Sequence, residues 1–231
     1  MKNKALAFMS FRLILGKLGQ KNDLAKKAVR GAITSVAISI IPLVIVLHIA
    51  NGMLFGIIQR LLELDSYHIQ IQPVVSNEIS EESLKIIRSV EHVTYAFPEK
   101  RSFGMLAANS SYEGVAIRAV PNEFFSEKNT ARFLKSEPEQ PQFNSQKDII
   151  LGESVAAKLR CKPGDAVMLI TAMQSEYANF IPKFSIFIVK GIVSSGYQPL
   201  DSQWVFISEA SAKRVFSENS TQSFKIGRAH V

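Results

Sequence analysis

The chain has 231 residues and a formal net charge of +7, a value that many nucleic-acid-binding proteins also have. The charge is unevenly placed: residues 1–31 carry eight basic side chains and one acidic side chain, Asp23, whereas the other 200 residues carry 19 of each sign. Because the whole excess lies before residue 32, a nucleic-acid-binding surface on the rest of the chain is not favoured.

The first segment, residues 4–18, mixes apolar side chains with Arg12 and Lys17. It is too short and too charged to span a membrane. The pattern favours an amphipathic helix that lies on the cytoplasmic leaflet, and the alternative is a frayed tail. We therefore assign residues 1–31 to a basic cytoplasmic segment.

Residues 32–59 contain no Asp, Glu, Lys or Arg. As a helix they would extend roughly 42 Å, more than the ~30 Å apolar core of a bilayer. The pattern predicts a transmembrane helix with an extension beyond the far interface, over residues 32–64. Pro42 should kink this helix, and Thr34 and Ser39 could bond the freed carbonyls. A cleaved signal peptide is disfavoured because the apolar run is too long for one.

Polar residues occur near the outer end of this helix, at His48 and Asn51, beside Gly52. Polar groups at membrane depth usually face protein or water, so these three residues are candidates for facing a partner or the substrate. The alternative is that His48 and Asn51 lie in the outer interface. The basic residues before the helix predict a cytoplasmic N-terminus, which places the following domain outside the cytoplasm.

Residues 65–225 predict an α+β domain, with a possible subdomain boundary in the polar, proline-containing stretch 136–147. A hairpin is expected around residues 109–111, and Ser208 should cap a helix. The predicted strands cover residues 67–74, 93–97, 103–109, 112–120, 148–151, 166–171, 183–193 and 203–207. The predicted helices cover residues 80–89, 122–134, 153–159 and 208–216.

Motifs of common enzymes are missing from the sequence. No phosphate-binding P-loop and no G-x-S-x-G motif occurs, and the four histidines have no spacing typical of metal ligands. We therefore expect no catalytic residue, no cofactor and no metal site. Cys161 is the only cysteine, so an intramolecular disulfide is impossible, and we expect this side chain to be buried as a small apolar group.

Several short motifs follow one another in a specific order. Asn51-Gly52 lies near the end of the span, and Tyr67-His68-Ile69 opens the first strand. Ile149-Ile150-Leu151-Gly152, Gly164-Asp165 and Val189-x-Gly191-Ile192 follow. In this order, over nearly all of residues 1–225, the chain resembles the LolC/LolE lipoprotein-releasing permeases, within the wider MacB/FtsX group of ABC transporter membrane subunits.

The resemblance implies the N-terminal portion of a four-span permease in the bacterial inner membrane, with a mixed α/β periplasmic domain of MacB-like core type. It implies four partners: a cytoplasmic ATPase subunit that hydrolyses the ATP, a second permease subunit, a lipoprotein substrate and a periplasmic carrier. Release of lipoproteins toward the carrier is the leading function. The alternatives are MacB/FtsX-type mechanotransmission to periplasmic partners and a single-span, membrane-anchored interaction module.

In LolC-like subunits one loop projects as a hook that holds the carrier. The corresponding segment here covers residues 172–183. Exposed aromatic and Met side chains on a loop are suited to protein contact, although these side chains could instead pack on their own sheet. The candidate carrier-binding residues are Met173, Gln174, Tyr177, Phe180, Ile181 and Pro182.

The last six residues, 226–231, read IGRAHV. A common sequencing adapter encodes this peptide in one reading frame, and it continues no pattern that precedes it. We expect an adapter artefact here, and the alternative is a genuine short tail.

Overall fold

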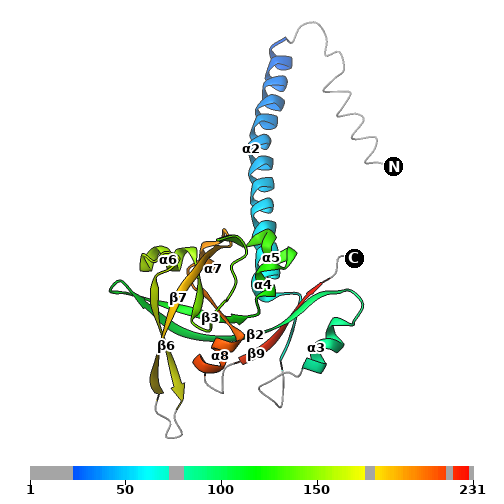
Figure 1. Cartoon of the computed structure of the whole chain (residues 1–231). Coiled ribbons are helices and arrows are strands. Elements are labelled where there is room, and N and C mark those ends of the chain that lie inside the picture. The colour runs from blue at the N-terminus through cyan, green and yellow to red at the C-terminus, as the bar shows by residue number, and fades with distance from the viewer. Residues whose placement is uncertain (1–22, 73–80, 175–179, 217–220, 229–231) are drawn as a thin grey trace. The chain divides into compact units, whose positions relative to one another are not determined.

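The structure is a computed structural model that describes residues 23–72, 81–174, 180–216 and 221–228 (Figure 1). The chain divides into two compact units, Met1–Gly56 and Ile57–Val231. The stretch 136–147 lies within the second unit.

Within these described ranges, the second unit combines short helices with nine strands, which confirms the predicted α+β class. The helices of the chain are α2 (Asp23–Leu61), the π-helix η1 (Leu62–Ser66), α3 (Glu81–Arg88), α4 (Glu123–Ser126), α5 (Lys128–Phe133), α6 (Glu153–Leu159), α7 (Gln198–Asp201) and α8 (Glu209–Val215). The strands are β1 (Ile69–Ile71), β2 (Val93–Ala108), β3 (Ser111–Val120), β4 (Lys135–Glu137), β5 (Asp148–Gly152), β6 (Ala166–Gln174), β7 (Phe180–Ser194), β8 (Trp204–Ser208) and β9 (Thr221–Arg228).

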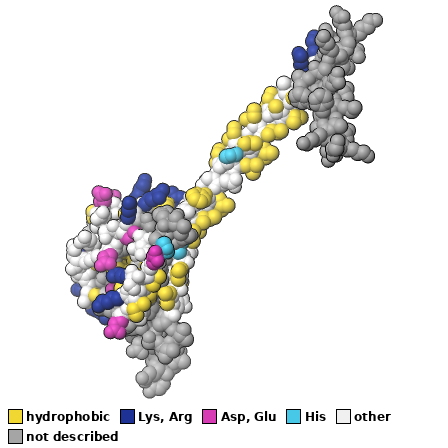
Figure 2. Space-filling model, turned by 90° about the vertical axis from the view of Figure 1, so that its right-hand side faces the viewer, with side chains coloured by type: hydrophobic (Ala, Val, Ile, Leu, Met, Phe, Trp, Pro, Cys, Tyr) yellow, Lys and Arg dark blue, Asp and Glu magenta, His cyan; other side chains and the backbone are white. Residues whose placement is uncertain are grey.

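The first unit contains most of α2, which starts earlier than the predicted span, at Asp23. The helical stretch Lys27–Ser66 is long and apolar enough to cross a membrane, with a mean hydropathy of 2.4. Figure 2 shows hydrophobic side chains along this helix. Such side chains, exposed over this length, are suited to lipid rather than to water.

The α-helical backbone continues through Pro42. The hydroxyl of Thr34 donates to the carbonyl of Arg30 at 3.0 Å, and that of Ser39 donates to the carbonyl of Ser35 at 2.8 Å. A proline at 42 frees the carbonyl four residues earlier, at position 38. The expectation that these two hydroxyls bond the freed carbonyl is therefore wrong, because each bonds the carbonyl of its own preceding turn.

A mixed sheet of nine strands organises the second unit. Its order is β1-β9-β2-β3-β8-β5-β7-β4, and β6 pairs with both β2 and β7. The path β2-β3-β8-β5-β7-β6 therefore returns to β2 and closes a ring of six strands. The pairs β3–β8 and β5–β7 are parallel, whereas every other strand pair is antiparallel.

Apolar side chains form two buried clusters. The first joins alternate residues of the six ring strands to residues of α6 and α8, and it includes Leu106, Ile117, Ile149, Leu151, Leu169, Phe187 and Val205. The second is rich in aromatic rings and includes Leu64, Tyr67, Phe97, Phe124, Phe125, Trp204 and Phe206. Alternation along each strand sends neighbouring residues to opposite faces, so one sheet serves both clusters.

Local signals were accurate at the turns and caps. Asn109 and Ser110 form the two-residue turn between β2 and β3, with φ values of 48° and 62°, and Asn tolerates this region well. The Ser208 side chain accepts a hydrogen bond from the Ser211 amide at 3.1 Å and caps α8. Cys161 is 5% exposed and lies in the first cluster, as expected.

Three predicted elements were wrong. The strands expected over residues 93–97 and 103–109 are a single strand, β2, that runs through Pro98. The helix expected over residues 122–134 is interrupted at Glu127, whose backbone is extended with φ −65° and ψ 132°. The Glu127 carboxylate accepts from the Thr130 amide at 3.0 Å, so this residue starts a new helix, α5.

The backbone of β9 pairs with β2 and β1 and continues as far as Arg228. The first three residues of the predicted adapter peptide thus belong to this strand. The origin of residues 226–231 stays a prediction.

Candidate functional site: a buried ionic cluster at the end of the apolar helix

The second unit begins with the last turns of α2, which continue directly into η1. The wide π turn is rare and places Leu64, 0% exposed, in the aromatic cluster. Tyr67 then turns the chain toward β1 with φ 56° and ψ 174°, a conformation that L-residues rarely adopt. Strain of this kind persists only where surrounding contacts hold it, and those contacts come from β2 and β3.

A carboxylate bridges two arginines beside this turn. Arg101 of β2 and Arg118 of β3 are direct cross-strand partners, an arrangement in which like charges repel. Glu99 lies two residues before Arg101 on the same strand face. Its Oε1 accepts from Arg101 Nε at 2.6 Å and from Arg118 Nε at 2.7 Å, and its Oε2 accepts from Arg118 Nη2 at 3.1 Å.

Arg101 also bonds η1. Its Nη1 lies 2.8 Å from Asp65 Oδ1, and its Nη2 donates to the Asp65 carbonyl at 2.8 Å. A second bond joins the same two elements, because Tyr95 of β2 donates its phenol proton to Glu63 Oε2 at 3.1 Å. Charge-assisted bonds of this kind are among the strongest between side chains. We call the residues Asp65, Tyr67, Glu99, Arg101 and Arg118 the ionic cluster.

Arg118 is almost fully enclosed, at 1% exposure. Its guanidinium carbon lies 4.5 Å from the ring centre of Trp204, 5.1 Å from that of Phe206 and 5.4 Å from that of Phe124. Among the described residues its Nη1 has no hydrogen-bond acceptor, so the aromatic faces supply the attraction there. Burial, the largest single influence, disfavours the charged form, but the charge and hydrogen bonds of Glu99, together with Tyr67 and Asp65, outweigh it and raise the pKa of Arg118.

Tyr67 completes the cluster, since its phenol oxygen accepts from Arg118 Nη2 at 3.1 Å. Burial raises the pKa of Tyr67 well above its ordinary value. Burial, with the nearby Glu63 carboxylate, also raises the pKa of Tyr95. Both phenols are therefore protonated at neutral pH. With two arginines and two carboxylates the ionic cluster is electrically balanced, a condition that buried charges require.

This arrangement suits mechanical attachment. Arg118 and Glu99 are 1% and 0% exposed, so a substrate cannot reach them without rearrangement. The cluster instead fixes the end of the helix to the centre of the sheet, because Arg101 bonds Asp65 of η1 and Arg118 bonds the adjacent Tyr67. The sequence analysis missed the cluster, although Arg118 within the apolar run 115–120 was a usable signal of a buried charge.

The predicted carrier-binding segment is mostly strand rather than loop. Met173 pairs with Ile181 and Gln174 pairs with Phe180, while Tyr177 lies outside the described residues. Residues 171–174 and 180–183, which extend beyond the pairing of β6 with β2, form a two-stranded ribbon that we call the hairpin arm. Figure 1 shows this ribbon projecting from the sheet. On it, Ile181 is 56% exposed and Pro182 is also exposed.

The candidate residues of the span lie on α2. His48, Asn51 and Gly52 are spaced three and four residues apart, so they share one face of the helix, and all three are exposed. His48 Nδ1 lies 2.9 Å from the Val44 carbonyl, a bond within the helix. Within the ranges that the structure describes, no group of three or more His, Cys, Asp or Glu side chains could hold a metal ion.

Comparison with known proteins gives one family match. The protein-family model described as "MacB-like periplasmic core domain" matches residues 31–227 of this chain. Among solved structures, the periplasmic region of MacB from Actinobacillus actinomycetemcomitans is similar, with 14% identity and a TM-score of 0.42, over 71% of this chain and 68% of that one. The extracellular domain of the noncanonical ABC-type transporter YknZ from Gram-positive bacteria has 12% identity and a TM-score of 0.46, over 71% and 85%. No curated protein matches.

Proposed function

The chain belongs to the family of ABC transporter permeases with a MacB-like periplasmic core domain, and on that basis we propose that it is the subunit that moves this domain in response to a partner ATPase. Members of MacB/FtsX-like families work with a cytoplasmic ATPase. The observation that carries the proposal is the ionic cluster, which bonds the end of the apolar helix to the sheet.

The cluster supports this role because it resists displacement. Two bonds from Arg101 hold Asp65 of η1, and Glu99 joins Arg101 to the enclosed Arg118. Separating η1 from β2 would break the Arg101–Asp65 ion pair, whose charge-assisted bonds are partly shielded from water, at 33% and 29% exposure. A force on η1 would therefore displace β2 and β3 with it.

The proposed cargo is a lipoprotein, lifted from the bacterial inner membrane and passed to a periplasmic carrier. In this proposal the N-terminus is cytoplasmic, and a second permease subunit faces this one across the lipoprotein. His48, Asn51 and Gly52 would line that path. Their common face on α2 supports this placement, because polar groups in a span usually face protein or water.

The hairpin arm is the proposed contact with the carrier. Exposed apolar side chains on a projecting ribbon, such as Ile181 at 56% exposure, favour protein contact. We expect Ile181→Asp in the full-length permease to reduce capture of the purified carrier by at least about tenfold, because a carboxylate would be desolvated at the interface.

The matched control for this experiment is Ile69→Asp in β1, where the native side chain is 55% exposed. Carrier capture should be normal in this variant, and both variants should melt like the wild type. Normal carrier capture by Ile181→Asp would refute the role of the arm.

A second candidate is mechanotransmission without lipid movement, as in MacB/FtsX-type permeases, and the ionic cluster favours it equally. The two candidates are separated by reconstituting the full permease with its ATPase in vesicles that contain an acylated lipoprotein. ATP-dependent release of the lipoprotein supports the leading proposal. ATPase activity that responds to a periplasmic partner without release would support mechanotransmission.

A further inference from the structure

One stretch of β7 has an unpaired edge. From Ile188 onward β7 pairs with β5, and from Phe180 to Ile188 it pairs with β6 on its other side. Within the described residues no strand covers the β5 side of β7 before Ile188. Open strand edges are the places where another extended chain can add to a sheet.

The direction of the backbone groups at this edge follows from one bond. The Ile188 amide donates to the Lys147 carbonyl at 2.7 Å, so the amide and carbonyl of residue 188 point away from β6. Alternate residues of a strand point their backbone groups to the same side. The amides of Phe184 and Ile186 therefore point to the open edge, about 7 Å apart, a spacing that fits successive carbonyls of an extended peptide.

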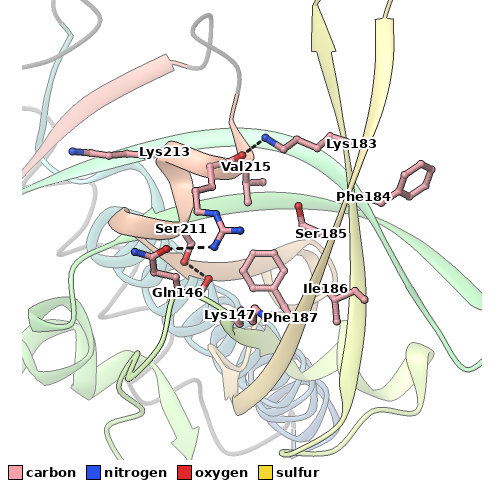
Figure 3. Close-up of a pocket in the computed structure, with 11 residues that line it drawn as sticks. Gln146, Lys147, Lys183, Phe184, Ser185, Ile186, Phe187, Ser211, Lys213 and Val215 are labelled. Atoms are coloured by element: carbon pink, nitrogen blue, oxygen red, sulfur yellow. Dashed lines mark hydrogen bonds between the residues drawn. The ribbon is translucent and has the colours of Figure 1, made fainter.

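A cationic cavity lies along this edge. It has a volume of about 530 Å³ and is lined by residues of β7, α8 and the turn before β5, as Figure 3 shows. Four cations contribute to the lining, and no carboxylate does so among the described residues; the cations are Lys147, Lys183, Lys213 and Arg214. Because residues 32–231 have no net charge, this is a local concentration of positive charge.

Neighbouring groups leave part of this charge available to a ligand. The Lys183 ammonium donates to the Arg214 carbonyl, and Arg214 Nη1 donates to Gln146 Oε1 at 3.4 Å, so both cations are positioned by neutral acceptors. Glu209 is close enough to Lys213 for their charges to interact. The cations of the cavity therefore attract an anionic ligand, and added salt would weaken this attraction.

Along this open edge, the two faces of β7 carry different side chains. Phe184 and Ile186 point away from the core and are 60% and 66% exposed. Residues 183, 185 and 187 lie on the opposite face, where Phe187 is buried and Lys183 meets α8. A chain added here would thus place alternate side chains against cations and against apolar groups.

We propose that this edge of β7 binds an extended, acidic segment of a partner protein by strand addition, with acidic side chains toward the cationic cavity and apolar side chains toward Phe184 and Ile186. The amides of Phe184 and Ile186 donate to the partner's carbonyls. The cations set its preference for an acidic partner, because opposite charges at an interface favour the matching partner and repel others.

The test uses the full chain in detergent micelles and a fluorescent, capped peptide that alternates Glu and Val. Anisotropy should show saturable binding that weakens with added salt. Reversing the charges with Lys147→Glu and Arg214→Glu should weaken binding at least about tenfold. Lys135→Glu, which changes an exposed lysine of β4 outside the cavity, is the control and should bind normally.

Strand addition is tested separately by Ile186→Pro. This change removes an amide that points to the open edge and not one that bonds β6, so the fold should persist and binding should be lost. A peptide with N-methyl groups on alternate amides gives the same test without altering the protein. Four outcomes would each overturn the proposal. The first two are binding equal to the wild type by Ile186→Pro with a normal melt, and equal binding by N-methyl peptides in either register. The others are full displacement of the peptide by inorganic phosphate, and no binding of the peptide at all.

Discussion

At the scale of single residues, Glu99 determines whether Arg118 can be buried. It is 0% exposed, and it neutralises two arginines that the strand register places side by side. Arg101 is about one third exposed and also bonds Asp65, whereas Arg118 has only buried partners. Loss of Glu99 would therefore affect Arg118 far more than Arg101.

We predict that Glu99→Leu lowers the free energy of unfolding by about 3–5 kcal/mol, because Arg118 would become a buried charge without a carboxylate. The double variant Glu99→Leu/Arg118→Met should be clearly more stable than the single variant, since it leaves no unpaired buried charge. Trp204 is the only tryptophan and lies against Arg118, so its fluorescence during urea unfolding reports on this region.

The stability of Glu99→Leu tests whether the ionic cluster holds η1 on the sheet. A single variant as stable as the wild type would mean that the cluster does not hold η1 on the sheet. A double variant no better than the single one would mean that Glu99 acts through Arg101 instead.

At the scale of elements, α6 and α7 meet at Gly152. This residue ends β5 with φ −63°, a conformation open to any residue, so the requirement for glycine is one of space. A Cβ atom there would lie 2.4 Å from the Asp201 carbonyl oxygen and 3.0 Å from that of Trp204. Both oxygens belong to backbone that cannot rotate away as a side chain can.

We predict that Gly152→Ala lowers the free energy of unfolding by about 1–3 kcal/mol through overpacking. Asp201 would have to shift, and its Oδ1 accepts the Ser195 amide at 2.8 Å. Gly114→Ala in β3, where a Cβ would meet nothing within 4 Å, is the matched control. Thermal melts of both variants measure the effect, and equal melting would contradict the role of space at residue 152.

The sequence predicted elements well where the signal was local. The turn at Asn109 and the cap at Ser208 depend on residues within one turn of each other, and both were confirmed. The sequence predicted two strands in place of β2 because Pro98 and the charges at 99–101 interrupt the apolar alternation. In the fold the strand continues, since Arg101 and Glu99 bond residues distant in sequence, Asp65 and Arg118.

The candidate sites depended still more on such distant contacts. The ionic cluster joins η1, β2 and β3, and the cationic cavity joins β7 and α8 with the turn before β5. No spacing within one segment encodes either arrangement. Strand pairing also changed the predicted loop 172–183, because its residues 172–174 and 180–183 lie in β6 and β7.

At the scale of the whole molecule, the charge of the chain is concentrated before its apolar helix. All of the excess of +7 lies in residues 1–31, and the helix itself is uncharged from residue 32 to 59. Cationic side chains beside a span tend to stay in the cytoplasm. This charge distribution should orient the chain in the membrane with its N-terminus in the cytoplasm.

We predict that changing Lys26, Lys27 and Arg30 together to Glu increases the fraction of molecules with an inverted orientation. Protease added to spheroplasts should then digest less of the large domain than in the wild type. The control changes the same residues to Arg, Arg and Lys, which keeps every charge. An unchanged protection pattern would mean that these three residues do not set the orientation.

The length of β2 has a consequence for the molecule as a whole. Arg101 lies in the ionic cluster, and Ala107 lies where β2 meets β6, six residues further along the same strand. At about 3.4 Å per residue these positions are about 20 Å apart. Over this whole stretch β2 is paired with β3, so it cannot shorten and acts as a rigid rod. A displacement delivered at the foot of the helix should then reach the base of the hairpin arm almost undiminished, and without any hinge in between.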